Sequence, residues 1–224
     1  MKLYSGPLSL FSRKVEIALR EKGLKFERVM VPFTQERGYQ PKHPDVLAAN
    51  PKGQVPVLVD GEFSLFDSTL IFEYLEETHP APPLMPKDPA DRAEVRMMEL
   101  RADEVVFPQA RVFFYRTDPP HPDPARRQLN EEAGARAEAA LRDHFAALDS
   151  TLGRREFLCN ALTYADIAMF MVILWTQRLK GPSLLPFPAL AAWYARLGKR
   201  PSFAKAASEI AAADRELTRF AAVG

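Results

Sequence analysis

Apolar and polar positions follow two different patterns along this chain. Up to about Thr78, short apolar runs typical of strands alternate with stretches of helical periodicity. Lys2–Tyr4 and Phe26–Val31 are the first two predicted strands. They flank a helix that Ser12 can cap and that ends near Gly23, because serine favours the N-cap and glycine the position after the C-cap. The chain therefore begins with a predicted βαβ unit.

A second group of predicted strands follows a looped segment. Pro56 stands where the strand Val57–Val59 begins, and Asp60-Gly61 predicts a tight hairpin into Glu62–Phe66. Asp67-Ser68 then opens a helix, and the order ββα after βαβ predicts a four-stranded mixed sheet covered by helices. Proline cannot donate to a sheet ladder, so Pro56 marks an edge, a bulge or a cis peptide. A cis bond there would turn nearby backbone groups outward, toward an extended peptide.

Beyond residue 79 the pattern is helical throughout. His79–Pro86 contains four prolines and reads as a stiff linker. The helices predicted after it are Arg92–Arg116, Glu131–Leu152, Thr163–Leu179, Ala189–Leu197 and one after Pro201. We therefore expect an α/β domain over residues 1–79, a linker over 80–87 and an all-helical domain over 88–224.

Composition and charge narrow the function classes. The formal net charge is +1 with both signs interspersed, which argues against a nucleic-acid or membrane-surface partner. The N-terminus lacks the apolar core of a signal peptide, and the longest apolar run, Ile167–Trp175, is too short to span a bilayer. The single cysteine, Cys159, has apolar flanks, which predicts a buried, inert thiol in a reducing compartment. The four histidines show no metal-ligand spacing, so we expect a cytoplasmic protein without a metal.

Four motifs point to one family. Ser9–Leu19, SLFSRKVEIAL, resembles the S-x-x-S-x-[RK]-V-x-x-A-L turn and helix of serine-type members. Asn50–Leu58, NPKGQVPVL, resembles the cis-proline segment, and Asp67-Ser68 the acidic-Ser pair that opens a helix. Leu162–Ile167, LTYADI, is similar to the capping box and hydrophobic staple. Together these motifs, in order over nearly the whole chain, resemble a soluble glutathione transferase.

The resemblance implies a fold, a partner and a reaction. The fold would be a thioredoxin-like N-terminal domain with cis-Pro56, followed by a C-terminal helical bundle. Such a protein binds glutathione as co-substrate, activates its thiol and directs the thiolate at a small hydrophobic electrophile. The resemblance also implies a homodimer.

Three hydroxyl groups are candidates for stabilising the thiolate. A free thiol has a pKa of roughly 8.5, and one hydrogen bond to the charged form, worth about 1.5–3 kcal/mol, lowers it by roughly one to two units. Ser9 precedes the first long helix, whose dipole favours an anion, and is the preferred catalytic residue. Ser12 and Tyr4 are the alternatives, although Ser12 can simply cap the helix and Tyr4 can simply be core. Because Ser9 and Ser12 occupy a C-x-x-C spacing with hydroxyls, thiol–disulfide exchange through a protein cysteine is excluded there.

The resemblance also assigns binding residues. Val55, before Pro56, matches the position whose backbone pairs with the glutathione cysteine. Asp67 and Ser68 match the γ-glutamyl end, where a helix N-terminus suits a carboxylate, although plain helix capping is an alternative role for the pair. The remaining expected glutathione contacts are Phe11, Lys42 and Gln54, the last two at the glycyl carboxylate.

We also expect particular residues to form the electrophile pocket and a structural cap in the helical domain. By resemblance, the pocket would be formed by Leu10, Arg111, Phe114 and Tyr115, with Phe11 beside it. Aromatic stripes are more often core, and Arg111 can equally lie on a solvated face. Thr163 and Asp166 are expected to form a structural cap rather than to act in catalysis.

Two rival functions remain open. One is a glutathione-dependent isomerase or dehalogenase, although the loop Ser9-Leu10-Phe11 differs from the Ser-Ser-Cys sequence typical of maleylacetoacetate isomerases. The other is a non-catalytic adaptor of the stringent-starvation type, which binds a protein partner. The retained Val55-Pro56 and Asp67-Ser68 pairs favour a working glutathione subsite over the adaptor.

Overall fold

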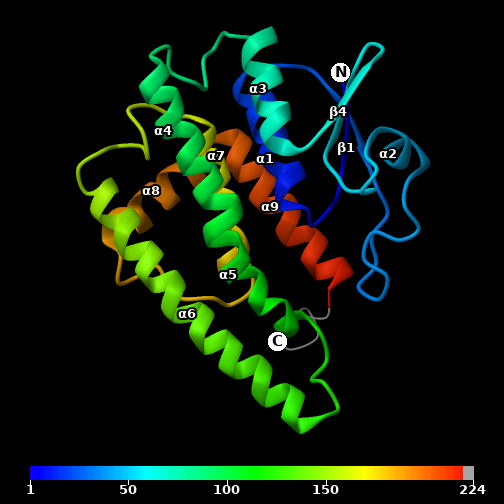
Figure 1. Cartoon of the computed structure of the whole chain (residues 1–224), viewed down its shortest axis with the longest axis vertical. Helices are drawn as coiled ribbons and strands as arrows, with labels where there is room; N and C mark the ends of the chain where they lie inside the picture. Colours follow the sequence, from blue (N-terminus) through cyan, green and yellow to red (C-terminus); the bar gives the residue numbers. More distant parts are fainter. Residues whose placement is uncertain (219–224) are drawn as a thin grey trace. The chain divides into compact units, whose positions relative to one another are not determined.

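The computed structural model describes residues 1–218, and the last part of the predicted helical domain, residues 219–224, lies outside them. The chain forms two compact units (Figure 1). The first comprises Met1–Met85 together with the helix that begins at Pro201, and the second comprises Pro86–Arg200. The final helix, which the sequence pattern groups with the helical domain, therefore packs in the first unit.

A four-stranded mixed sheet is the centre of the first unit, as predicted. Its strands are β1 (Lys2–Ser5), β2 (Glu27–Met30), β3 (Val57–Asp60) and β4 (Phe63–Phe66). The strand order is β2-β1-β3-β4, in which β1 and β2 are parallel and the other two neighbouring pairs are antiparallel. This is the arrangement expected when ββα follows βαβ.

Four helices accompany the sheet: α1 (Leu10–Glu21), α2 (Pro44–Ala49), α3 (Ser68–Thr78) and α9 (Pro201–Leu217). Helix α1 contacts β1, α3 and α9, whereas α2 contacts β4. The sequence pattern treats α2 as a loop, because this short helix buries only Val46 and shows no apolar stripe. Its start is capped by His43, whose Nδ1 accepts the N–H of Asp45 at 3.2 Å.

Alternate residues of β1 point to opposite faces of the sheet, and this places the turn that follows. Leu3 and Ser5 are fully buried, and the Ser5 hydroxyl donates to Glu16 of α1 at 2.6 Å. Tyr4 points to the other face and packs with Val46 of α2 and other apolar side chains. The turn from Ser5 to α1 therefore starts on the helix-covered face.

The turn after α1 and the β3–β4 hairpin are both present as predicted, but the hairpin loop is shifted by one residue. Gly23 has φ 67° just after the C-cap of α1, as the sequence predicts. In the hairpin, Asp60 pairs with Phe63, so the two-residue loop is Gly61-Glu62 rather than the predicted Asp60-Gly61. Gly61 has φ 62°, which glycine adopts without steric cost.

The second unit is helical. Its segments are α4 (Pro89–Leu100), a π-helical turn η1 (Arg101–Val106), α5 (Phe107–Arg111), a 3₁₀ segment η2 (Val112–Thr117), α6 (Pro124–Leu152), α7 (Tyr164–Arg178) and α8 (Pro188–Gly198). Every residue from Tyr164 to Ile173 is buried, so α7 is the central helix of this unit. Full burial explains why its sequence is apolar all round and shows no stripe.

The sequence predicts a single α-helix over Arg92–Arg116. The extent of this helical segment is close to the prediction, but its helix type is not α throughout. The helical path runs from Pro89 to Thr117 but changes to a π-helical turn and then to 3₁₀ geometry. Pro108 has no N–H, so the carbonyl of Glu104 lacks its usual donor four residues on, and the preceding turn widens. Apolar periodicity alone does not reveal such a change.

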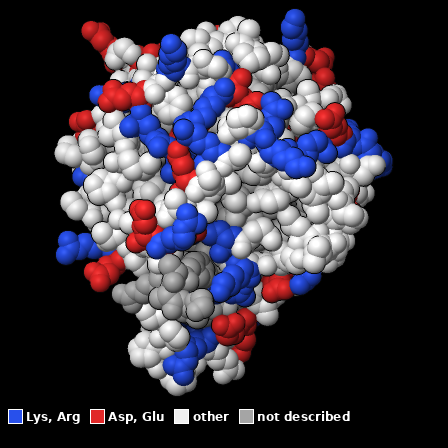
Figure 2. All heavy atoms as spheres, turned by 180° about the vertical axis from the view of Figure 1, so that it is seen from behind, with Lys and Arg blue, Asp and Glu red and all other residues white. Residues whose placement is uncertain are grey.

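Surface charge, membrane-spanning helices, metal ligands and the single cysteine were all subjects of prediction from the sequence. On the face in Figure 2, acidic and basic side chains are intermixed. Within residues 1–218, no helix combines the length and apolar character needed to cross a membrane, and no three His, Cys, Asp or Glu side chains gather as metal ligands. Cys159 is only 5% exposed, and burial raises the pKa of its thiol to about 12. This confirms the expected burial of Cys159.

Candidate functional site

The turn that follows β1 presents the predicted catalytic serine. Ser9 is the N-cap of α1, with φ -86° and ψ 109°. Its Oγ accepts the N–H of Ser12 at 3.2 Å, as an N-cap side chain does. The expectation that Ser12 caps this helix is therefore wrong. Leu10, only 2% exposed, starts the helix one turn earlier, and Ser12 lies fully buried at its third position.

The hydroxyl proton of Ser12 is used in a hydrogen bond, whereas that of Ser9 is not. Ser12 donates its hydroxyl proton to Ser9 Oγ at 3.1 Å and accepts the N–H of Gly6 at 3.4 Å. Ser9 Oγ thus accepts from both the N–H and the hydroxyl of Ser12. A serine hydroxyl has one proton and two lone pairs, so the proton of the partly exposed Ser9 is left to donate to a ligand.

Tyr4 does not offer a comparable proton. Its hydroxyl donates to Oδ2 of Asp45 on α2 at 2.5 Å. That hydrogen bond, followed by burial, raises the pKa of Tyr4 to about 12. Its ring belongs to the apolar cluster on the face of the sheet away from α1. Of the three hydroxyls considered, Ser9 is the one placed to donate.

Tyr39, a residue that the sequence analysis missed, also contacts this turn. Tyr39 lies in the loop before α2, and its hydroxyl accepts the N–H of Leu8 at 3.2 Å. A Cβ on Gly6 would come within 2.5 Å of that hydroxyl, so a larger residue at this position would require the Tyr39 ring to shift. Nothing in the local pattern around Tyr39 signals this contact, because the two segments are far apart in the sequence.

The segment before β3 has the expected cis peptide between Val55 and Pro56. Within the described residues, neither the N–H nor the C=O of the half-buried Val55 makes a hydrogen bond. Asn50, also missed by the sequence analysis, organises the turn: its amide donates to the Gln54 carbonyl at 2.8 Å and accepts the Lys52 N–H at 3.0 Å. Asparagine side chains commonly bond backbone in this way. The Val55 backbone is therefore held in place and remains free to pair.

Asp67 and Ser68 lie at the start of α3. Asp67 is the N-cap and has φ 75°, which is uncommon for a residue other than glycine. Its Oδ1 accepts the N–H groups of Thr69 at 3.0 Å and Leu70 at 3.4 Å, so capping occupies this carboxylate. The N–H and hydroxyl of Ser68 have no hydrogen-bond partner among residues 1–218. Ser68 thus offers two donors at a helix N-terminus, where a carboxylate is favoured.

The other expected glutathione contacts lie in the same unit. Lys42 passes close to Gly53, whose added Cβ would come within 3.2 Å of two Lys42 side-chain carbons. The neighbouring Gln54 side chain is exposed. Phe11 lies in the first turn of α1, and the Lys14 ammonium is 5.5 Å from the centre of its ring. These positions remain predicted contacts.

The predicted pocket residues divide between the two units. Leu10 is buried in the first, whereas Arg111 and Phe114 are exposed in the second, with the Phe114 ring centre 6.2 Å from that of Trp175. The Tyr115 hydroxyl donates to Glu131 of α6 at 3.0 Å. Burial is the largest influence on the pKa of Tyr115 and raises it, whereas the hydrogen bond with Arg116 acts in the opposite direction. The electrophile pocket stays a prediction.

The capping pair of the second unit is fully internal. The Thr163 N–H donates to Asp166 Oδ2 at 3.0 Å, and the Thr163 hydroxyl donates to the same oxygen at 3.2 Å. A capping box therefore starts α7. Asp166 Oδ1 accepts the Leu158 N–H and the Trp193 indole N–H, both at 3.0 Å. Burial raises the pKa of Asp166 and the four hydrogen bonds oppose that rise. Both carboxylate oxygens of Asp166 therefore accept two hydrogen bonds each, as expected of a residue with a structural role.

A thioredoxin-like unit followed by a helical unit is the architecture of glutathione transferases. Residues 3–83 match the family described as glutathione S-transferase, N-terminal domain, and residues 105–201 match glutathione S-transferase, C-terminal domain. The chain belongs to the glutathione S-transferase family.

Similar proteins in this family have differing descriptions. A stringent starvation protein A homolog of Coxiella burnetii is 30% identical over 97% of this chain and 96% of its own length. A probable maleylacetoacetate isomerase of Vibrio cholerae is 32% identical over 92% of this chain and 95% of its own. A glutathione S-transferase of Methylobacterium radiotolerans, solved in complex with glutathione sulfonate, is 31% identical over 92% of this chain and 93% of that one, with a TM-score of 0.74. Family membership thus leaves the particular activity to be argued from the site.

Proposed function

We propose that this protein is a glutathione transferase that binds glutathione on its first unit and activates the thiol through Ser9. The observation that carries the proposal is the Ser9 hydroxyl: it accepts twice from Ser12, and its own proton is left for a ligand. It also stands at the N-terminus of a twelve-residue helix, where the macrodipole favours an anion.

Glutathione would lie along the first unit as a short extended peptide. Its cysteine would pair with the unpartnered backbone groups of Val55. Its γ-glutamyl carboxylate would accept from the N–H and hydroxyl of Ser68, and its glycyl carboxylate would lie near Lys42 and Gln54. This placement would bring the thiol to the Ser9 turn. The complex of the Methylobacterium radiotolerans relative with glutathione sulfonate supports a glutathione subsite.

The Ser9 hydroxyl would shift the thiol toward thiolate. A free thiol titrates at roughly 8.5, so only a small fraction is ionised at neutral pH. A hydrogen bond to the charged sulfur, worth about 1.5–3 kcal/mol, lowers the pKa by roughly one to two units. The released proton passes to solvent, the thiolate forms a carbon–sulfur bond with the electrophile, and the leaving group departs with its bonding electrons. An apolar electrophile is expected, and the protein is expected to act as a homodimer.

The test is an ultraviolet difference titration of glutathione with the purified protein across pH, following the thiolate band. We expect a saturable signal whose pKa is about one to two units below that of free glutathione. Bound glutathione with an unshifted thiol pKa would refute activation by Ser9. Absence of both the signal and calorimetric binding would refute the glutathione subsite itself.

The adaptor alternative is favoured by similarity to stringent starvation protein A homologs, one of them matched over 96% of its own length. An adaptor would not need the thiol pKa to fall. The titration therefore separates the two functions before any substrate is known.

A glutathione-dependent isomerase or dehalogenase is the second alternative. The similarity to a probable maleylacetoacetate isomerase favours it, whereas the loop Ser9-Leu10-Phe11 differs from the Ser-Ser-Cys loop typical of such isomerases. An isomerase would show the same thiol signal but regenerate glutathione after each turnover. Measuring glutathione consumption against product formation distinguishes it from a transferase.

A further inference from the structure

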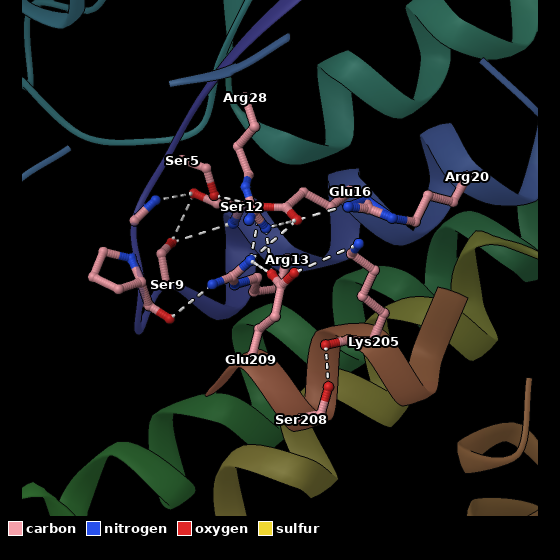
Figure 3. A network of polar contacts seen from close by, with 12 residues as sticks. Ser5, Ser9, Ser12, Arg13, Glu16, Arg20, Arg28, Lys205, Ser208 and Glu209 are labelled. Atoms are coloured by element: carbon pink, nitrogen blue, oxygen red, sulfur yellow. Dashed lines mark hydrogen bonds and ion pairs between the residues drawn. The ribbon is translucent and has the colours of Figure 1, made fainter. Parts of the chain in front are cut away.

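An ion cluster lies beside the Ser9 turn and joins three elements of the first unit (Figure 3). Its members are Arg13, Glu16 and Arg20 of α1, Arg28 of β2, and Lys205 and Glu209 of α9. The two matched family domains cover residues 3–83 and 105–201, so Lys205 and Glu209 of α9 lie outside both matched ranges.

Arg13 is the central member of this cluster. Its side chain is 2% exposed. Nη1 donates to both carboxylate oxygens of Glu16 at 3.1 Å and to Glu209 Oε2 at 2.6 Å. Nη2 donates to the carbonyl oxygen of Pro7 at 3.3 Å. One guanidinium therefore connects α9 with the turn that carries Ser9.

The planar guanidinium makes this connection directional. Fixing Nη1 against a carboxylate also fixes where Nη2 points, because both nitrogens belong to one rigid group. Glu209 makes the shorter contact to Nη1, and Glu16 lies one turn away on the same helix as Arg13. Glu209 is thus the anchor of Arg13 that comes from outside α1.

The Pro7 carbonyl lies within the same short turn as the Ser9 hydroxyl. Ser9 N–H donates to the Gly6 carbonyl at 3.2 Å, and Gly6 N–H donates to Ser12 Oγ. The orientation of the Pro7 peptide therefore bears on where the Ser9 side chain is held. A displacement of about 1 Å at a reacting group is enough to change catalysis strongly.

We propose that Glu209 is a positioning residue for thiol activation: through Arg13 it holds the Pro7 carbonyl and so the Ser9 hydroxyl. The inference rests on the proposed activation of glutathione by Ser9. It assigns the last described helix a role in the chemistry of the first unit, beyond packing against α1.

An electrostatic role for Glu209 predicts the opposite sign. The cluster has four cationic side chains and two carboxylates, so removing Glu209 makes the surroundings of the turn more positive. A more positive surrounding would lower the pKa of a bound thiol. Loss of position would raise that pKa, because the Ser9 hydrogen bond would weaken.

The experiment compares full-length Glu209→Ala, Glu209→Gln and Lys205→Ala with the wild type, using glutathione as the probe. Lys205 is 54% exposed and pairs with Glu209 at 3.9 Å, so its removal is a matched control on the same helix. We expect Glu209→Ala to raise the pKa of the bound thiol by about one unit, a tenfold change, with glutathione affinity altered less than about twofold. Glutamine keeps an acceptor oxygen and should recover at least half of the shift, and Lys205→Ala should match the wild type.

A second readout covers the case in which the thiol is not activated at all. Amide hydrogen exchange of the peptide that spans residues 6–12 should be faster in Glu209→Ala than in Lys205→Ala, without any ligand. An unchanged or lowered thiol pKa in folded Glu209 variants would overturn the proposal. If wild-type protein does not lower the thiol pKa, the proposed function fails, and equal exchange rates would then overturn the positioning role as well. If Glu209→Ala fails to fold, Glu209→Gln is compared with Lys205→Ala in both readouts.

Discussion

Helices α1 and α7 both begin with polar side chains that bond to groups of the first turn, but the two starts leave different groups available. At α7, the carboxylate of Asp166 is fully buried and accepts four hydrogen bonds. At α1, the partly exposed Ser9 accepts two bonds and retains a proton. A saturated cap can only support the fold, whereas a cap with a spare donor can also bind an anion. The proposed site at α1 therefore differs from the structural cap at α7 in keeping an unused donor.

The largest expected effect is on the saturated cap. Asp166→Ala leaves three buried donors without an acceptor: the N–H groups of Leu158 and Thr163, and the indole of Trp193. Each such loss costs about 1–3 kcal/mol, so we expect the three together to destabilise the fold by roughly 3–9 kcal/mol and to lower Tm by roughly 10 °C or more. Thermal and urea unfolding measure this. A Tm within about 2 °C of wild type would contradict the assigned support, and glutathione affinity in the folded protein should be unchanged.

Ser9→Ala is expected to act mainly on chemistry. Loss of the donor should raise the pKa of bound glutathione by roughly one to two units, and loss of the cap should cost about 1 kcal/mol of stability. The ultraviolet titration and urea unfolding report the two effects separately. Ser9→Asp is the matched control, since aspartate caps well but repels a thiolate. It should restore stability without restoring the low thiol pKa, and recovery of both would remove Ser9 from thiol activation.

A smaller effect is expected at the start of α3. Ser68→Ala removes one of two donors offered to a carboxylate and should weaken glutathione binding by about 1–1.5 kcal/mol, or roughly tenfold. The thiol pKa of the bound glutathione should stay as in wild type. Calorimetry and the titration together test this. A shifted thiol pKa with unchanged affinity would reverse the roles assigned to Ser68 and Ser9.

The smallest expected effect is that of Thr163→Ala. The backbone N–H of Thr163 still donates to Asp166, whereas the hydroxyl is lost both as a donor to Asp166 Oδ2 and as the capping-box acceptor of the Asp166 N–H. We expect destabilisation by about 0.5–1 kcal/mol, measured by urea unfolding, with no change in glutathione affinity. A loss as large as that of Asp166→Ala would mean that the threonine hydroxyl, rather than the aspartate, organises the cap.

The strands, the hairpin and most helices could be predicted because each leaves a local signal. The N-cap of α1 could not, since Ser9 and Ser12 are both plausible caps three residues apart. The burial of Leu10 decides between them, and that is a tertiary contact. Helix α2 was missed because its six residues bury one side chain.

The long-range members of the site were also beyond local pattern. Tyr39 contacts the Ser9 turn from a loop, and Glu209 of the last described helix contacts Arg13, which donates to the Pro7 carbonyl of that turn. Neither position differs in sequence from an ordinary surface residue. Local signals and the family resemblance made Ser9 and Ser68 candidates, whereas the contacts of Tyr39 and Glu209 are visible only in the folded chain.

The π-helical turn η1 has a consequence for sequence comparison. A π turn accommodates one residue more than an α turn, so it is equivalent to a single-residue insertion inside a continuous helix. After Val106, the helical wheel is rotated by about 100° relative to the wheel that the first part of the helix defines. A relative without this turn would align with Arg111 and Phe114 only after a one-residue gap. Gap-free alignment through this helix would therefore transfer pocket residues to the wrong face.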